Sequence, residues 1–265
     1  MTLSPLARLL RPLLDTVHGL DRCLDRGWAG LARVFGGLLA GWWVYVPLHE
    51  LLHAAACRLA GGEVTRLEID ALYGGALLAR VFPFVVPASD YAGRLSGFDT
   101  GGSDLVYLAT DLGPFVLTLF PGVWGLRRAA AARAGLLFGA LLPFALAPFL
   151  SLTGDAYEIG SIVVTNLPPW EAPALREALR GDDLLRRGEA LRGLADAPWG
   201  GFLLAASLGL LWAFLMYGMG AAVARRGGQG PVPPGPHAGR RSQSDSGASR
   251  AIERPPSEPM KIGSL

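Results

Sequence analysis

Four long apolar stretches dominate the hydrophobic pattern of this 265-residue chain. They cover residues 34–60, 105–126, 134–152 and 202–224. Each is close to the ~20 residues that an α-helix needs to cross the hydrocarbon core of a bilayer. The pattern therefore predicts an all-α polytopic membrane protein with about four transmembrane helices.

The segment before the first stretch, residues 1–33, has a different pattern. Neither the apolar core nor the cleavage site of a signal peptide is present. Leucines instead recur at helical spacing between arginines: Leu6, Leu9, Leu10, Leu13 and Leu14. This favours an amphipathic helix that lies on the membrane surface. A helical cap packed on the bundle is the alternative.

Between the first two stretches, the sequence predicts a small β-hairpin. Residues 64–69 alternate apolar and polar side chains over most of their length, which is typical of a strand. Tyr73-Gly74-Gly75 is a turn signal, and residues 76–86 form a second extended run that Pro83 bends or breaks. We expect this hairpin to pack against the bundle, because backbone of this kind persists at membrane depth only where protein or trapped water satisfies it.

The rest of the chain divides into a core and a tail. Residues 171–197 are charged and amphipathic, which predicts one or two short surface helices between the third and fourth stretches. Beyond residue 226, Gly, Pro, Ser and Arg replace large apolar side chains, so residues 227–265 are expected to be disordered. Residues 34–226 then form the membrane-embedded core.

Composition and charge agree with this organisation. Hydrophobic residues make up 51% of the chain and charged residues 17%, which argues for a membrane protein and against a soluble enzyme. A net charge of +2 is too small to indicate a nucleic-acid partner. Arginines gather in residues 1–33, in residues 127–133 and at 225–226, so the positive-inside rule predicts cytoplasmic N- and C-termini.

The first apolar stretch contains His49-Glu50-Leu51-Leu52-His53. On a helix, positions four apart share one face, so both imidazoles can bind one metal ion while Glu50 lies beside it. Ionisable groups within a membrane span normally persist only with a partner or a function. The motif therefore predicts a membrane-embedded zinc hydrolase, most plausibly a protease. The alternative is a polar cluster that joins two transmembrane helices by hydrogen bonds.

A catalytic zinc ion needs a third protein ligand and one open position. Spans one and three run in the same direction, so the end of the third span should reach the depth of the histidines. Asp155 lies there, and we predict it as the third ligand, with Glu158 as its partner or substitute. Asp111, inside the second span, is the competing ligand. Cys57 follows His53 by four residues and is expected to be a small buried side chain rather than a ligand.

The predicted chemistry is hydrolysis of a peptide bond. Zinc lowers the pKa of a bound water toward ~7, and Glu50 accepts the proton as that water attacks the carbonyl carbon. Glu50 then returns the proton to the leaving amine. A helical substrate must unwind locally, and the edge of the expected hairpin could hold the unwound segment by strand addition.

These residues resemble the site-2 protease group of intramembrane zinc metalloproteases. The His49–His53 motif followed by Gly61-Gly62 is similar to the first core helix of that family and its exit. The strand before Gly74-Gly75 resembles its hairpin region, and Leu112-Gly113-Pro114 resembles its Ala-Gly-Pro element. Asp155 stands where the family has an aspartate zinc ligand, but in Gly154-Asp155-Ala156 rather than Leu-Asp-Gly, and no Asn precedes it.

The resemblance covers about residues 42–164 and implies a zinc-dependent endopeptidase of membrane-anchored proteins, with Glu50 as the base and His49, His53 and Asp155 as ligands. It implies a multi-pass position in the bilayer, which we expect to be the bacterial inner membrane. The contrasting hypothesis is a non-hydrolytic membrane scaffold or metal-binding transporter that keeps the cluster for binding. Nothing in the sequence indicates the oligomeric state.

Overall fold

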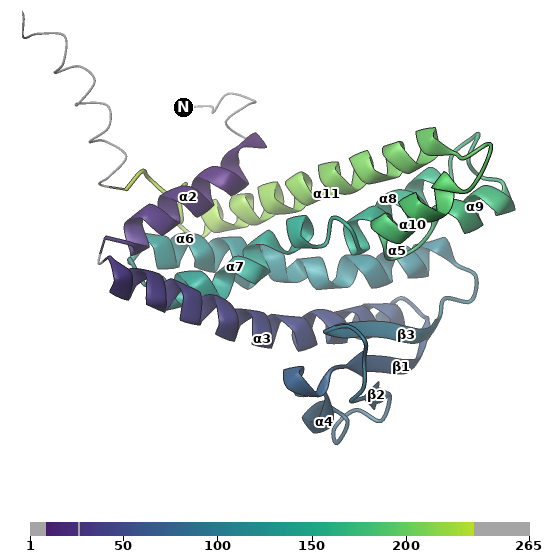
Figure 1. The fold of residues 1–265 in the computed structure, drawn as a ribbon. Helices are drawn as coiled ribbons and strands as arrows, with labels where there is room; N and C mark the ends of the chain where they lie inside the picture. Colours follow the sequence, from purple (N-terminus) through teal and green to yellow (C-terminus); the bar gives the residue numbers. More distant parts are fainter. Residues whose placement is uncertain (1–8, 26, 236–265) are drawn as a thin grey trace, which may run out of the picture.

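The computed structural model describes residues 9–25 and 27–235, and it is mostly helical (Figure 1). Four helical segments are long and apolar enough to cross a membrane: Trp28–Leu59, Asp104–Ala131, Gly135–Val164 and Trp199–Arg226. They overlap the four predicted stretches, so the fold class is confirmed. The chain has the architecture of a multi-pass membrane protein.

The first and fourth crossings are single helices, α3 (Trp28–Leu59) and α11 (Trp199–Arg226), whereas the second is broken. It runs through α5 (Asp104–Leu112), a 3₁₀ turn η2 (Gly113–Phe115), a π-helical turn η3 (Thr118–Val123) and α6 (Trp124–Ala131). Pro114 and Pro121 lie in the two irregular turns, where each lacks the N–H of a regular helix.

The third crossing consists of α7 (Gly135–Leu150) and α8 (Asp155–Val164), separated by a turn over residues 151–154. The prediction ended this span at residue 152, which is wrong. Apolar side chains resume after the polar turn, and α8 packs against α11. Asp155 therefore lies at a break within the crossing, as the first residue of α8, rather than beyond its end.

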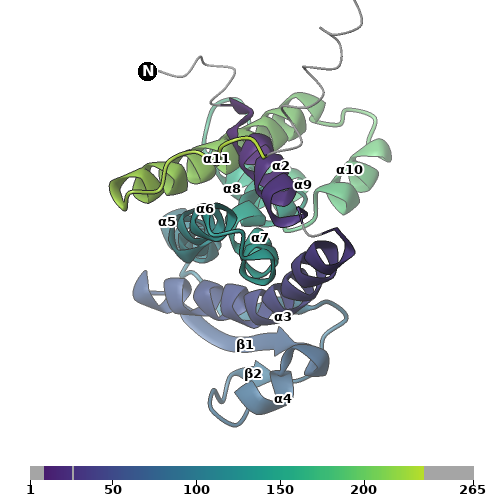
Figure 2. The same cartoon turned by 90° about the vertical axis from the view of Figure 1, so that its left-hand side faces the viewer.

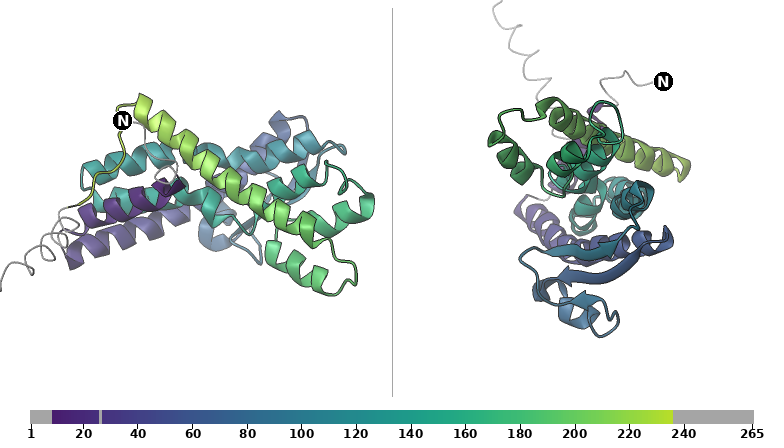
Figure 3. Two further views of the ribbon diagram at one scale, coloured as in Figure 1. Left: turned by 90° about the horizontal axis from the view of Figure 1, so that it is seen from above. Right: turned by 90° about the vertical axis from the view of Figure 1, so that its right-hand side faces the viewer.

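Glycines let the helices of the bundle approach closely. α3 packs on α7, and a Cβ at Gly41 would overlap the backbone of Ala140, while a Cβ at Gly139 would overlap that of Val34. Small residues at such positions are a common feature of transmembrane helix packing. Figure 2 shows the resulting order, with α11 on one side, α5 to α8 in the middle, and α3 between them and the sheet. Viewed from above, α11 crosses obliquely over the other helices (Figure 3).

The segment between the first two crossings is a three-stranded sheet of order β2-β1-β3 rather than a simple hairpin. β1 (Glu63–Ile69) pairs in antiparallel fashion with β3 (Gly93–Asp99) and in parallel with the short β2 (Val85–Val86). The predicted second strand is wrong over most of its length. The chain after Asp70 instead forms a 3₁₀ turn (Ala71–Tyr73) and a short helix α4 (Gly75–Leu78).

Local chemistry explains this correction. The Asp70 side chain accepts a hydrogen bond from Leu72 N, which starts the 3₁₀ turn, and Gly74 ends it with a φ of 82°. The inner face of the sheet packs on the outer side of α3, where its apolar residues surround Ala54 and Cys57. Figure 1 shows the sheet and α4 beside α3, within its length.

The predicted surface helices are present as α9 (Pro173–Leu179) and α10 (Leu184–Arg192). At the opposite end of the bundle, α2 (Arg11–Cys23) packs against α6 and α7 (Figure 1). This agrees with the alternative of a helix packed on the bundle, although exposed leucines lie just before α2 and in its first turn, as an interfacial helix requires: Leu9, Leu10, Leu13 and Leu14. The tail, residues 227–265, was expected to be disordered. Within its described part, Val232 is buried against the bundle. For residues 236–265, which lie outside the described residues, disorder stays a prediction.

A buried ion pair, which the sequence did not indicate, joins α2 to the bundle. Asp15 Oδ2 accepts hydrogen bonds from Arg127 Nε at 2.9 Å and Nη2 at 2.6 Å, and from Tyr217 Oη at 3.0 Å. Arg127 Nη1 also donates to Ala221 O, and Val232 N donates to Asp15 Oδ1. Asp15 and Arg127 are 2% and 1% exposed, so α2, α6, α11 and the segment after α11 share one desolvated contact.

Asp15→Asn should destabilise the protein strongly, because it leaves the Arg127 guanidinium buried without a counter-charge. Removing one partner of a buried ion pair costs about 3–5 kcal/mol. The measurement is the thermal unfolding midpoint in detergent. Asp25→Asn is the matched control, because Asp25 pairs with the half-exposed Arg133 at 3.0 Å and should lose little. Equal midpoints for the two variants would contradict the structural role of the buried pair.

Gly41→Leu should also lower the unfolding midpoint, because the new side chain meets the backbone of α7 around Ala140. Overpacking of this kind typically costs ~1–3 kcal/mol. Gly36→Leu provides the control, since a side chain at Gly36 meets open space on the same helix. If both variants behaved alike, the close contact between α3 and α7 would be refuted.

Candidate metal centre

The two histidines of the motif project from one face of α3 into the bundle, and Asp155 meets them from the start of α8. His49 and His53 are 8% and 7% exposed. Their Nε2 atoms lie 3.2 Å apart. Asp155 Oδ2 lies 3.0 Å from His49 Nε2, and Asp155 Oδ1 lies 3.6 Å from His53 Nε2. The structure therefore brings together the three residues predicted as metal ligands.

These separations are compatible with a small divalent ion. Bonds of about 2.0–2.2 Å to nitrogen and oxygen place the ligand atoms of a tetrahedral site roughly 3.3–3.6 Å apart. The two Nε2 atoms are 3.2 Å apart, and each imidazole has a different Asp155 oxygen as its nearest, at 3.0 Å for His49 and 3.6 Å for His53. Asp155 Oδ2 is buried and, despite its proximity to His49, has no partner in hydrogen-bond alignment. The group could hold a metal ion, and it supplies three ligands with one tetrahedral position left over.

The Nδ1 atoms of both imidazoles, on the side of each ring away from Asp155, contact polar groups that the sequence did not predict. His53 Nδ1 lies 2.9 Å from Thr110 O, and because a carbonyl can only accept, the ring proton belongs on Nδ1. The lone pair of His53 Nε2 then faces Asp155 and His49. His49 Nδ1 lies 2.7 Å from Tyr45 Oη. Such partners fix ring orientation in metal sites.

Tight helix packing places these partners. Gly113 begins the 3₁₀ turn after α5, and a Cβ there would lie 2.6 Å from the Cβ of Ala56 and 2.7 Å from Leu52 O. Only glycine therefore lets this turn contact α3 closely enough for the Thr110 carbonyl to reach His53. Tyr45 precedes His49 by four residues, so helical spacing alone could have found it. Thr110 lies 57 residues from His53 and gave no local signal.

The break in the third crossing positions Asp155. Helices α9 and α10 together form what we call the α9–α10 cap. The turn before α8 is tied to this cap, because Leu184 N, at the start of α10, donates to Thr153 O at 2.8 Å. Asp155 is the first residue of α8, where the unpaired N–H groups and the helix dipole favour a carboxylate. If the helix ran continuously through residues 151–154, Asp155 would not lie at a helix start with unpaired N–H groups, and its side chain would point in the direction that the regular helix dictates.

Glu50 lines a cavity of about 610 Å³ that also contains His53 and Asp155 in its wall. Its side chain lies against Gly93 of β3, where a Cβ would overlap it. Within the described part of the chain, no hydrogen bond or ion pair engages the Glu50 carboxylate. It is therefore available to a proton-carrying group inside the cavity.

The other candidate residues lie near the centre but outside the ligand group. Asp111 and Glu158 both line the cavity, and Glu158 accepts a hydrogen bond from Tyr107. Neither joins His49 and His53 within ligand distance among the described residues, so the geometry favours Asp155 over both. Cys57 is fully buried in the apolar core beneath the sheet, as predicted for a non-ligand.

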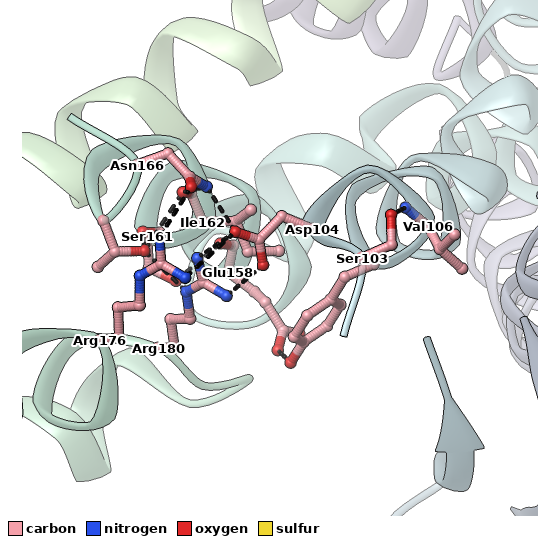
Figure 4. A network of polar contacts seen from close by, with 11 residues as sticks. Ser103, Asp104, Val106, Glu158, Ser161, Ile162, Asn166, Arg176 and Arg180 are labelled. Carbon is pink, nitrogen blue, oxygen red and sulfur yellow. Dashed lines mark hydrogen bonds and ion pairs between the residues drawn. The ribbon is translucent and has the colours of Figure 1, made fainter. Parts of the chain in front are cut away.

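A network of ion pairs and hydrogen bonds ties the α9–α10 cap to α5 and α8 (Figure 4). Arg180, which follows α9, donates to both carboxylate oxygens of Asp104 at 2.5 and 2.8 Å. Arg180 Nε donates to Thr165 Oγ1 at 2.7 Å, and Asn166 Nδ2 donates to Asp104 Oδ2 at 2.9 Å. The start of α5, the end of α8 and the segment after α9 are thereby fixed to one another.

His49→Ala and Asp155→Ala should each abolish stoichiometric metal in the purified protein, because each leaves only two of the three ligands. Asp111→Asn, a change outside the ligand group, should retain it. The measurement is elemental analysis of metal per polypeptide. The ligand assignment would be overturned by metal that survives Asp155→Ala but is lost on Asp111→Asn, or by wild-type protein without bound metal.

Comparison with known proteins gave no match: no protein-family model matches the chain, and neither does a curated protein or a solved structure. The function of the centre therefore has to be inferred from its own residues.

Proposed function

We propose that this chain is a zinc-dependent intramembrane endopeptidase that hydrolyses peptide bonds of membrane-anchored proteins. The observation that carries the proposal is the convergence of His49, His53 and Asp155 beside the free carboxylate of Glu50, at a cavity within an apolar helical bundle. The resemblance of the same residues to site-2 proteases points to the same activity.

The donor set favours zinc. Two imidazoles and one carboxylate, with one open position, form a common protein ligand set of catalytic zinc sites. A structural zinc site would usually have four protein ligands, and a magnesium or calcium site would use oxygen donors. When bound, zinc would lower the pKa of a water in the open position and polarise a substrate carbonyl.

Glu50 supports hydrolysis by its position. Its carboxylate shares the cavity with His53 and Asp155 and can accept the proton of the attacking water, then deliver it to the leaving amine. Tyr45 and the Thr110 carbonyl keep the imidazole rings oriented throughout. The Asp155 side chain is only 18% exposed, and the cavity has room for a peptide segment and a water.

The sheet supports a protein substrate. β3 is an edge strand, because the order β2-β1-β3 gives it one neighbour, and its residues 93–96 and Phe98 contribute to the cavity wall. An extended substrate segment can pair with such an edge and lie across the cavity. The carbonyls of a helical substrate are shielded by its own hydrogen bonds, so unwinding onto β3 would expose the scissile bond.

Glu50→Gln should abolish cleavage while leaving the metal content unchanged, because it removes the general base but no ligand. Loss of a general base typically costs about 10²–10⁴-fold in rate. Purified protein in proteoliposomes would be given a panel of single-span membrane proteins, and mass spectrometry would report cleavage. Glu63→Gln, on the exposed side of β1, serves as the control.

If wild-type protein and Glu50→Gln bind metal equally and neither cleaves any member of the panel, the protease proposal fails. That outcome would instead favour a metal-binding scaffold or transporter. Full activity in Glu50→Gln would likewise contradict the role of Glu50.

A further inference from the structure

Two carboxyl groups in the cavity wall have no role in the proposed hydrolysis. Asp111 of α5 and Glu158 of α8 are 4% and 6% exposed, and the two helices pack against each other. Glu158 accepts a hydrogen bond from Tyr107. Asp111 Oδ2 is buried and has no hydrogen-bond partner. A buried carboxylate without a partner is unfavourable, so this position calls for a donor that the chain itself does not provide.

The arginines of the cavity wall do not provide that donor. Arg180 is engaged by Asp104 and Thr165, as described above, and Arg94 pairs with Asp182 at 3.2 Å near the outside of the cavity. Arg187 Nη1 donates to a backbone carbonyl of α9. Arg186, the remaining arginine of the wall, is exposed, and among the described residues no ion pair reaches Asp111 or Glu158.

Asp111 and Glu158 do not belong to a group of protein ligands like the one at the metal centre. Among the described residues, three or more His, Cys, Asp and Glu side chains close enough to share one ion occur only at His49, His53 and Asp155. Two carboxylates beside one hydrogen-bonded tyrosine match instead the planar donor array of a guanidinium, or an ammonium group.

We propose that Asp111 and Glu158 form a subsite that receives a basic side chain, Arg or Lys, of the substrate segment lying next to the scissile bond. This inference rests on the proposed endopeptidase function and adds a substrate class to it. The cavity of about 610 Å³ reaches continuously from Glu50 and Asp155 to Asp111 and Glu158, so one peptide can contact both parts. The membrane-embedded segments preferred by this protein would carry one buried basic residue close to the cleavage position.

Binding of short peptides to Glu50→Gln protein tests this subsite without cleavage. The peptides form a series in which one position at a time carries Arg, citrulline or norleucine. Citrulline has the shape of Arg without the charge, and norleucine has an apolar chain of similar reach. We expect Arg at one position to bind about tenfold or more tightly than either, because a charged guanidinium forms stronger hydrogen bonds to carboxylates than a neutral group does. Fluorescence anisotropy reports the dissociation constants.

Variants of the Glu50→Gln protein then show which residues cause the preference for Arg peptides. Asp111→Asn and Glu158→Gln, each made in the Glu50→Gln protein, should bring the ratio of Arg to citrulline binding close to one. Asp182→Asn is the matched control, because Asp182 lies in the same cavity wall, is half exposed and carries the same charge. Its ratio should stay unchanged. A preference lost equally in all three variants would indicate a general charge effect and overturn the subsite.

Outcomes for the subsite and for the protease proposal are separable. Cleavage of the substrate panel without any preference for a basic residue would reject the subsite and leave the endopeptidase standing. Preferential binding of Arg peptides by a protein that cleaves nothing would retain the subsite and reject the endopeptidase. Equal binding of Arg, citrulline and norleucine at every position would reject the subsite outright.

Discussion

The structure depends on one constraint: imidazole and carboxylate groups inside an apolar bundle need polar partners, and here they find them by converging on one place. His49 and His53 lie four residues apart on α3, and that spacing turns both Nε2 atoms toward the same place. Asp155 closes the group from α8. Other local features near the centre, such as the close contact at Gly113, bring a partner within reach of one of these groups.

Irregular backbone in the second and third crossings is best understood through this constraint. A regular helix satisfies its own backbone groups and presents side chains only at fixed angles. The break before α8 frees the start of a helix for Asp155, and the turn at Gly113 lets the Thr110 carbonyl contact His53. Such breaks are tolerated at membrane depth where they are buried in protein or line a polar cavity. Here both border the cavity or the metal centre.

Two polar clusters at opposite ends of the molecule fix the positions of the broken helices relative to their neighbours. At one end, Asp15 and Arg127 join α2, α6 and α11 in a desolvated contact. Toward the other end, Asp104 and Arg180 join α5, α8 and the α9–α10 cap (Figure 4). The metal centre and the cavity lie nearer to the second cluster, since Arg180 lines the cavity. The apolar surfaces of the helices tolerate sliding, whereas these directional contacts specify one arrangement.

The sequence predicted those features whose signals are local. Hydrophobic length gave the four crossings, helical spacing gave the pairing of His49 with His53, and comparison of depths between spans gave Asp155. It failed where a polar turn interrupts a regular pattern. The first strand of the expected hairpin is present, but the second was wrong over most of its length because a capped turn at Asp70 competes with strand formation, and the third span was ended too early because hydropathy drops at the polar turn before Asp155.

Contacts between distant segments were also beyond sequence reasoning. Asp15 and Arg127 are 112 residues apart, and neither sits in a motif. Thr110 acts on His53 through its backbone carbonyl, so its side-chain type carried no information.

X-ray absorption spectroscopy at the metal edge of the purified wild-type protein tests the central claim most directly. We expect zinc with two imidazole nitrogens and one or two oxygens at about 2.0–2.2 Å, and no sulfur. A spectrum with a sulfur ligand near ~2.3 Å, or with a single imidazole, would contradict the convergence of His49, His53 and Asp155 on one ion.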